Sequence, residues 1–280
     1  TWGESHGKGI GVVIDGCPAG LSLSEEDIQV YLDRRKPGQS QFTTGRKESD
    51  MAQIWSGVFE GRTTGTPISI LVQNQDQRSR DYGNIMNTYR PGHADYTFDE
   101  KYGFRDYRGG GRSSGRETTA RVAAGAVAAK ILKELGIEVH AYTKAIGPVS
   151  VPENEYHPEE IFQNPIYMPS NAYAQKASAY LEECIKNQDS SGGIIECVVT
   201  GMPVGIGDTV FEKLDANLAK AMLSIGAVKG FEIGDGFKAA DTKGSINNDS
   251  FHTKDGRITK DTNHAGGVLG GMSDGSKIIF

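Results

Sequence analysis

A short unit of strand, glycine-proline turn and helix occurs twice in this chain, and it constrains the fold more than any other feature. The first copy reads VVIDGCPAGL over residues 12–21, and the second reads VVTGMPVGI over residues 198–206. Both have the order strand, G-x-P-x-G, aliphatic residue and predicted helix. Duplication of one such unit predicts two equivalent halves packed in layers.

Hydrophobic periodicity and turn residues predict the elements around these units. Ser24, with Asp27 three residues later, indicates the start of a helix that ends before Pro37. Ser114 and Glu117 have the spacing of a capping box ahead of an alanine-rich helix. We expect strands at 10–15, 52–59, 67–73, 137–146, 193–200 and 276–280, later helices at 116–135, 172–187 and 211–224, and irregular stretches at 76–115 and 150–170.

Composition excludes several classes of protein. The 37 glycines follow no Gly-X-Y period, so the chain is not collagen-like. A net charge of −6 argues against a general nucleic-acid binder. The three cysteines form no CxxC pair and indicate a reducing, cytoplasmic setting. The chain contains no 18-residue apolar run, so we predict no membrane-spanning helix.

The start at Thr1 and a strand cut off at Phe280 predict one domain, 1–280, truncated at both ends.

The arginines are concentrated in one part of the chain. All of them except Arg257 lie between Arg34 and Arg121. Arginine binds carboxylate and phosphate through paired hydrogen bonds, so the cluster is typical of a pocket for a small polyanion. A set of salt bridges within the protein is the alternative, and the sequence leaves both open.

Two histidines lie in glycine-containing motifs that favour catalysis. His6 is part of GESHG, residues 3–7, and His93 follows the turn of RPGHAD, residues 90–95. Ser5 also fits the G-x-S-x-G pattern of a serine hydrolase, but a strand rather than a helix is predicted after it. His93 and Asp95 are too few ligands for a metal, and we expect none. His264, in a late glycine-rich segment, is a candidate third proton carrier.

The segment RGGGRSSGR, residues 108–116, has two functional interpretations. It resembles the RGG tracts that bind RNA, but it occurs once and runs directly into a helix. Its glycines, serines and arginines at a helix N-terminus also suit a phosphate. It matches neither the Walker nor the Rossmann pattern.

Taken together, these motifs resemble the chorismate synthase family. The resemblance rests on TWGESHG at 1–7, DRR at 33–35, RPGHADYT at 90–97, YRGGGRSSGRE at 107–117, AVKG at 227–230, EIGDGF at 232–237 and NHAGGVLGG at 263–271, in the family's order.

This resemblance implies an activity, its cofactors and an assembly. The family converts 5-enolpyruvylshikimate 3-phosphate to chorismate by anti 1,4-elimination of phosphate, with reduced FMN and no net redox change. NADPH is a candidate reductant of the flavin. The family fold is α+β, with helices between two antiparallel sheets and an internal pseudo-twofold repeat. The family usually forms a homotetramer in the cytoplasm, with no nucleic-acid or membrane partner.

The resemblance also assigns roles to single residues. His6 would protonate the departing phosphate, and His93 would balance the charge of the reduced flavin. The implied FMN contacts are Arg112, Ser113, Ser114, Gly226, Ala227 and Gly270, and the implied substrate or NADP contacts are Arg35 and Arg46.

The chain departs from the family pattern at three places. Gln41 stands where the family often has a second arginine, for which Arg46 or Lys47 would substitute. Gly226 replaces a common asparagine. The family's KPTSS-type and RHDPC-type segments do not occur, and the second of these carries an aspartate assigned to proton abstraction.

Overall fold

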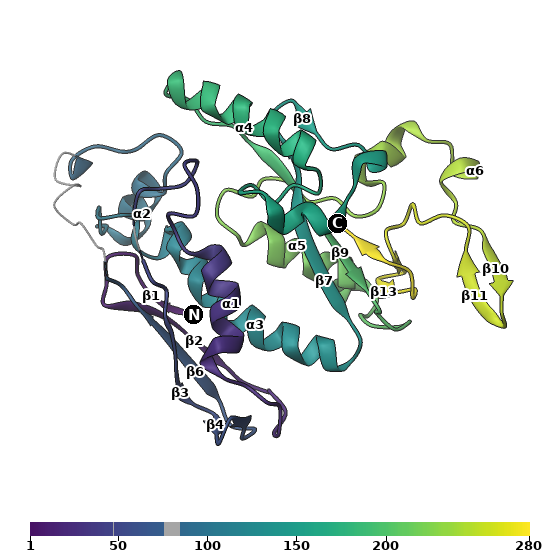
Figure 1. The fold of residues 1–280 in the computed structure, drawn as a ribbon, viewed down its shortest axis with the longest axis horizontal. Helices are drawn as coiled ribbons and strands as arrows, with labels where there is room; N and C mark the ends of the chain where they lie inside the picture. The colour runs from purple at the N-terminus through teal and green to yellow at the C-terminus, as the bar shows by residue number, and fades with distance from the viewer. Residues whose placement is uncertain (47, 76–84) are drawn as a thin grey trace. The chain divides into compact units, whose positions relative to one another are not determined.

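The chain folds into two compact units, Thr1–Ile131 and Leu132–Phe280, which we describe separately. The computed structural model describes residues 1–46, 48–75 and 85–280 (Figure 1). The prediction of a single domain over 1–280 stays a prediction.

The first unit is built on an antiparallel sheet of order β1-β2-β6-β3. Its strands are β1 (Trp2–Gly3), β2 (Gly9–Ile14), β6 (Ile68–Gln73) and β3 (Ala52–Ser56). The hairpin β4 (Val58–Phe59) and β5 (Arg62–Thr63) lies between β3 and β6 in the chain. The single strand predicted over 52–59 is therefore wrong at Gly57, whose positive φ of 82° interrupts the extended backbone.

Three helices belong to this unit. They are α1 (Glu25–Arg35), α2 (Asp95–Tyr102) and α3 (Thr118–Glu134), the last of which ends in the second unit. Ser24 begins α1 as predicted, because its backbone N–H donates to Asp27 at 2.9 Å. Helix α2 was not predicted, since 76–115 was expected to be irregular. Its sequence is largely polar and shows no apolar face that would predict a helix. Residues 76–84 of the stretch lie outside the described residues.

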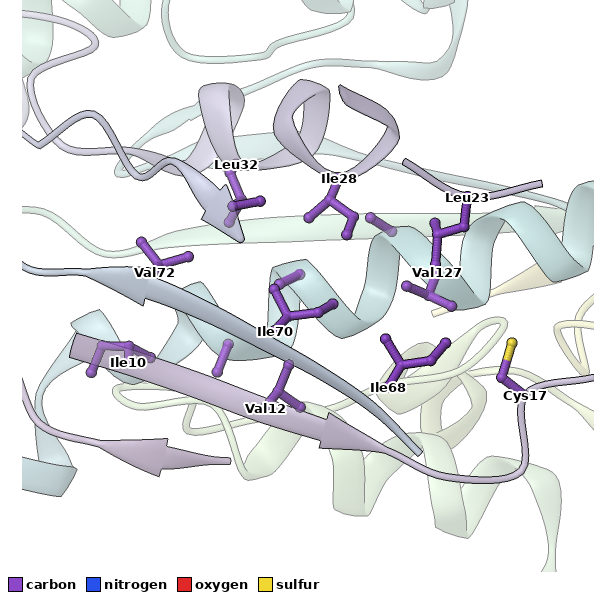
Figure 2. Close-up of a cluster of buried hydrophobic side chains, with 14 residues drawn as sticks. Ile10, Val12, Cys17, Leu23, Ile28, Leu32, Ile68, Ile70, Val72 and Val127 are labelled. Atoms are coloured by element: carbon purple, nitrogen blue, oxygen red, sulfur yellow. The ribbon is translucent and has the colours of Figure 1, made fainter. Parts of the chain in front are cut away.

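The core of the first unit lies where the sheet meets α1 and α3. Alternate residues of β6, namely Ile68, Ile70 and Val72, point to this side together with Ile10 and Val12 of β2 (Figure 2). They pack against α1 and α3 side chains that include Ile28, Leu32 and Val127. The period of two along the strands and of three to four along α1 places these apolar residues on facing surfaces.

The second unit contains another four-stranded antiparallel sheet, of order β14-β9-β7-β8. Its strands are β14 (Ile278–Ile279), β9 (Gly193–Thr200), β7 (Glu138–Ile146) and β8 (Val149–Ser150). The helices are α4 (Asn171–Lys186), α5 (Leu214–Leu223) and α6 (Gly244–Asn247). Two hairpins complete it, β10 (Phe251–Lys254) with β11 (Arg257–Lys260), and β12 (Val268–Leu269) with β13 (Met272–Ser273).

The predicted loop at 150–170 contains two 3-10 turns, Glu153–Glu155 and Pro158–Gln163. The helix predicted at 211–224 is divided into a 3-10 turn, Val210–Glu212, and α5. No helix in the described ranges is long and apolar enough to cross a membrane.

The predicted internal repeat is confirmed by hydrogen bonds within each unit. In the first, the Thr63 hydroxyl donates to Pro18 O at 2.6 Å and accepts from Leu21 N at 3.0 Å. In the second, the Ser273 hydroxyl donates to Pro203 O at 2.5 Å and accepts from Ile206 N at 2.9 Å. The same side-chain chemistry therefore closes both G-x-P-x-G turns.

The repeat is longer than the sequence analysis found. Residues 57–70, GVFEGRTTGTPISI, align with residues 267–280, GVLGGMSDGSKIIF. Ile14 pairs with Ile68 in one sheet, and Val199 pairs with Ile278 in the other. The two segments diverge in most side chains, but their glycines coincide, because both copies need positive φ at the same turn positions.

The hydroxyl that closes each turn gives a testable contribution to stability. We expect Thr63→Val and Ser273→Ala each to lower the free energy of unfolding by about 1–3 kcal/mol. Each substitution leaves one backbone carbonyl and one backbone N–H of the turn without the hydroxyl as a hydrogen-bond partner. Chemical denaturation of each variant measures this. Thr64→Val, at an exposed position, is the control. Equal unfolding midpoints for Thr63→Val and Thr64→Val would contradict the assignment.

Candidate active site

Two successive glycines bring the two predicted catalytic histidines together in the first unit. Gly109 and Gly110 have φ values of 65° and 91°. A Cβ on Gly109 would lie 2.7 Å from Nε2 of His6, and a Cβ on Gly110 would lie 2.8 Å from Nε2 of His93. Both distances are too short for a real side chain, so each imidazole contacts a backbone that must be glycine.

His6 lies in a tight turn between β1 and β2. The Gly7 N–H donates to Glu4 O at 3.0 Å, and the Asn74 side-chain amide donates to both Glu4 O and Gly7 O at 2.9 Å. Ser5, next to His6, is 2% exposed. A strand follows this turn, so the strand–turn–helix context of a hydrolase elbow does not occur.

His93 is oriented by a buried carboxylate. Its Nδ1 lies 3.1 Å from Asp95 Oδ1, which leaves Nε2 on the side of Gly110. Asp95 also forms a bidentate ion pair with Arg90, at 2.7 and 2.8 Å. Hydrogen bonds from the Arg90 side chain hold the pKa of Asp95 well below its usual range. The carboxylate is therefore ionised at neutral pH and fixes the position of the imidazole.

The loop after Gly110 is folded into two 3-10 turns, Gly111–Ser113 and Gly115–Glu117. The Ser113 and Ser114 N–H groups donate to Gly110 O and Gly111 O. The predicted capping box is wrong: Ser114 Oγ accepts from Arg116 N, and the Glu117 carboxylate accepts from Thr1 and Arg121 instead. The tighter 3-10 turns give local hydrogen-bond partners to backbone N–H groups that would have none in the first turn of a regular α-helix.

A cavity of about 720 Å³ lies against this loop. This volume is within the range of small-molecule sites. Its polar lining includes the side chains of His93, Arg112 and Ser113 and the backbone of Gly110. The aromatic side chains that line the cavity are Phe98, Tyr102, Phe104 and Tyr107. A flat, partly apolar ligand with an anionic group would find both kinds of surface here.

The described arginines of the cluster are already paired with groups of the protein. Arg112 donates to Gly3 O at 2.7 Å, and Arg108 forms a bidentate pair with Asp106. Arg78 and Arg80 lie outside the described residues. The salt-bridge alternative therefore accounts for much of the cluster, including residues that also line the cavity.

The two predicted substrate arginines belong to a buried ion cluster, which we define as Arg35, Arg46, Glu48, Asp50 and Arg116. Arg35 lies 3.2 Å from Asp50, and Arg46 lies 2.8 Å from Glu48. Arg116 lies 2.8 Å from Asp50. Both carboxylate side chains are fully buried. Three guanidinium groups therefore share two carboxylates, and the cluster carries a net positive charge.

Arg46 reaches the histidine turn, because its Nη2 donates to Ser5 O at 3.1 Å. Lys47, the other predicted substitute for the family arginine at Gln41, lies outside the described residues. The side chains that sequence reasoning missed are Asn74, Glu48 and Asp50. Their signal was weak, since each stands in a polar stretch without a recognisable motif.

The remaining predicted cofactor contacts belong to the second unit. Ala227 has a φ of 70°, which is unusual for a residue with a Cβ, and Gly270 has a φ of 59°. A Cβ at Gly226 or at Gly270 would meet nothing within 4 Å.

His264, also in this unit, has its Nδ1 3.0 Å from Asp249. Burial alone would raise the pKa of Asp249, but hydrogen bonds from Ala265, Thr262 and His264 outweigh burial and lower it. Within the described ranges, no group of three or more His, Cys, Asp or Glu side chains could hold a metal ion.

The fold and the cavity indicate a class of protein, and the similarity to known proteins gives its family. A histidine that lines a partly polar cavity, on an α+β fold with antiparallel sheets, is typical of an enzyme that binds an anionic small molecule. The family model for chorismate synthase matches residues 1–280. The chain belongs to the chorismate synthase family.

Individual relatives agree. The chorismate synthase of Agathobacter rectalis is 66% identical over 280 residues, which are all of this chain and 76% of that protein. The chorismate synthase of Lachnoclostridium phytofermentans is 64% identical over 281 residues, which span all of this chain and 77% of that protein. A crystal structure of chorismate synthase superposes with a TM-score of 0.83 at 33% identity, covering 99% of this chain and 81% of that one. The predicted family and fold are thus confirmed.

The requirement for glycine at position 110 can be tested directly. Gly110→Ala places a Cβ 2.8 Å from His93 Nε2 at a φ that L residues rarely adopt. We expect turnover to fall by about 10²-fold, because small misplacement of a catalytic group has effects of this size. Gly125→Ala in α3, where a Cβ meets nothing within 4 Å, is the control. Similar chorismate formation by both variants would contradict the proposed packing.

The Asp95 ion pair predicts a pH dependence of stability. The folded-state pKa of Asp95 lies below the unfolded value of about 3.9. The ionised group therefore stabilises the fold above that value, and this contribution is lost as the pH falls toward the folded pKa. We expect the unfolding free energies of Asp95→Asn and the parent to differ at pH 7 and to converge below pH 4 in denaturation curves. A difference that is constant from pH 7 to pH 3 would refute this.

Proposed function

We propose that this protein carries out the family's reaction, the anti 1,4-elimination of phosphate from 5-enolpyruvylshikimate 3-phosphate to give chorismate. The observation that carries the proposal is the placement of His6 and His93 against Gly109 and Gly110, with His93 and Gly110 lining the 720 Å³ cavity. Elimination needs a proton donor at the leaving phosphate and stabilisation of negative charge, and histidine can supply both near neutral pH.

His6 is proposed to protonate the departing phosphate. Its turn is fixed at both ends by the Asn74 amide, and its ring contacts the Gly109 backbone. Such restraint holds a proton donor in one orientation, which is the main requirement for general acid catalysis.

His93 is proposed to act as the cationic partner of the cofactor. The Asp95 carboxylate lies 3.1 Å from its Nδ1. Its Nε2 lies on the side of Gly110, which also lines the cavity. This arrangement places the imidazole at the cavity wall.

The cavity is proposed to bind reduced FMN. The aromatic side chains in its lining suit a planar ring, and Gly110 lets the loop backbone lie against His93, where a Cβ would clash. Arg112, Ser113 and Ser114 would hold the cofactor, and Gly226, Ala227 and Gly270 are further proposed contacts on the strength of the family motifs. Reduced FMN supplies electron density to the elimination when it is bound. NADPH is proposed as its reductant.

The substrate carries three anionic groups, two carboxylates and one phosphate. The buried ion cluster has one more guanidinium than carboxylates, which favours anions near it. Arg46 and Arg35 are proposed as substrate or NADP contacts. Because both are bonded to buried acids, their guanidinium groups are held in place before a ligand binds, which lowers the entropic cost of binding.

Two rival functions from the sequence have less support. A serine hydrolase would need an accessible nucleophile, but Ser5 is 2% exposed and lies between two strands. An RNA-binding RGG tract would lack regular structure, but 111–117 forms 3-10 turns that run into α3.

A homotetramer in the cytoplasm, with one domain per chain, is also proposed from the family resemblance. The exposed apolar side chains of the first unit's sheet region, Val13, Trp55 and Phe59, are consistent with contact between copies. Light scattering of the purified protein measures the mass directly.

Replacement of either histidine tests the assigned roles. We expect His6→Ala and His93→Ala each to lower turnover by about 10²-fold or more, the scale of a lost general acid or electrostatic partner. The assay is anaerobic chorismate formation by full-length enzyme with reduced FMN. His140→Ala, whose side chain is 52% exposed beside Glu138, is the control. Near-normal turnover in both site variants would reject the roles.

A further inference from the structure

The turn that carries His6 is closed by a single side chain from another strand end. Asn74 follows β6 directly, and its Nδ2 donates to Glu4 O and to Gly7 O, each at 2.9 Å. These carbonyls are the first and last of the four-residue turn. Together with the Gly7 N–H, which donates to Glu4 O at 3.0 Å, this amide fixes the separation of the two ends, and the imidazole lies between them.

The orientation of the Asn74 amide is chemically determined. Its Oδ1 accepts from Arg116 Nε at 2.6 Å. A flipped amide would point its NH2 group at a guanidinium, which has donors only. The Nδ2 group must therefore face the turn, where both of its hydrogens have carbonyl acceptors.

Arg116 is itself held by buried charge. It is 5% exposed, with Nη1 2.8 Å from Asp50 and Nη2 3.8 Å from Glu48. Glu48 also binds Arg46, which donates to Ser5 O. The buried ion cluster therefore reaches the histidine turn by two routes, through Asn74 to Glu4 and Gly7, and through Arg46 to Ser5.

We propose that Asn74, oriented by Arg116, is a positioning residue for His6. Its side chain donates to two backbone carbonyls of the turn and accepts from Arg116, and it acts on the reaction through the imidazole. The inference rests on the proposed catalytic role of His6. Because the His6 ring packs against Gly109 with no room for a Cβ, a small shift of the turn would displace it from its working position.

Two variants separate positioning from folding. Asn74→Asp keeps the size and the acceptor for Arg116 but removes both donors to the turn. Asn74→Ala removes all three hydrogen bonds. Asn164→Ala is the matched control, because Asn164 also bridges two carbonyls, Glu160 O at 3.0 Å and Met168 O at 2.8 Å, on a loop without predicted site residues.

The experiment combines kinetics with a readout that does not depend on activity. Full-length variants are assayed for anaerobic chorismate formation, and the His6 imidazole is titrated by NMR with ¹³C-labelled histidine, assigned from His6→Ala. We expect Asn74→Asp to lower kcat by about tenfold or more, with KM changed by less than about threefold, and to move the His6 titration midpoint. The midpoint of His264 and the kinetics of Asn164→Ala should remain those of the parent.

Each other outcome has a defined meaning. Parent-like kcat and an unmoved His6 midpoint in folded Asn74→Asp overturn the proposal, as does a fall in kcat without any change at His6. If Asn74→Ala does not fold, Asn74→Asp decides. A moved midpoint in Asn74→Asp together with an active His6→Ala supports positioning and rejects the catalytic role, so the two inferences fail separately.

Discussion

The approach of two imidazoles to the backbone of Gly109 and Gly110 is the constraint on which this site depends. Each glycine has a positive φ, and each would clash with a histidine if it carried a Cβ. The loop can therefore pass close to both rings only with this pair of residues. The 3-10 turn that follows places Arg112 and Ser113 at the cavity that His93 also lines, so one short segment contacts both histidines and contributes to the polar lining.

Buried charge provides the rigid support for that segment. The buried ion cluster joins the end of α1, the segment before β3 and the start of α3, and it reaches the His6 turn through Arg46 and Asn74. Burial of ions is costly unless they are paired, and a pair broken on one side is strongly destabilising. These arginines therefore hold the backbone in place and also contribute positive charge where an anionic substrate is proposed to bind.

Much of the fold and part of the candidate site could be predicted from the sequence. Strands, α1 and the internal repeat follow from apolar periodicity and from glycines at turns, which are local signals. His6 and His93 were predicted as site residues because they stand in motifs. Helix α2 was missed because it is short and polar, and the Ser114 capping box failed because local backbone bonds gave a tighter turn. Asn74 and Glu48 were missed because their function is to join segments far apart in sequence, and only the fold shows which segments meet.

A double-mutant cycle on the two histidines tests the central claim, that both rings act in one site. Gly109 and Gly110 are adjacent, so the rings that contact them are close enough for their effects to be coupled. Turnover is measured for His6→Ala, His93→Ala and the double variant under anaerobic conditions with reduced FMN. The account predicts that the double variant loses clearly less than the product of the two single losses, as for groups that act as a unit. A loss equal to that product would contradict it.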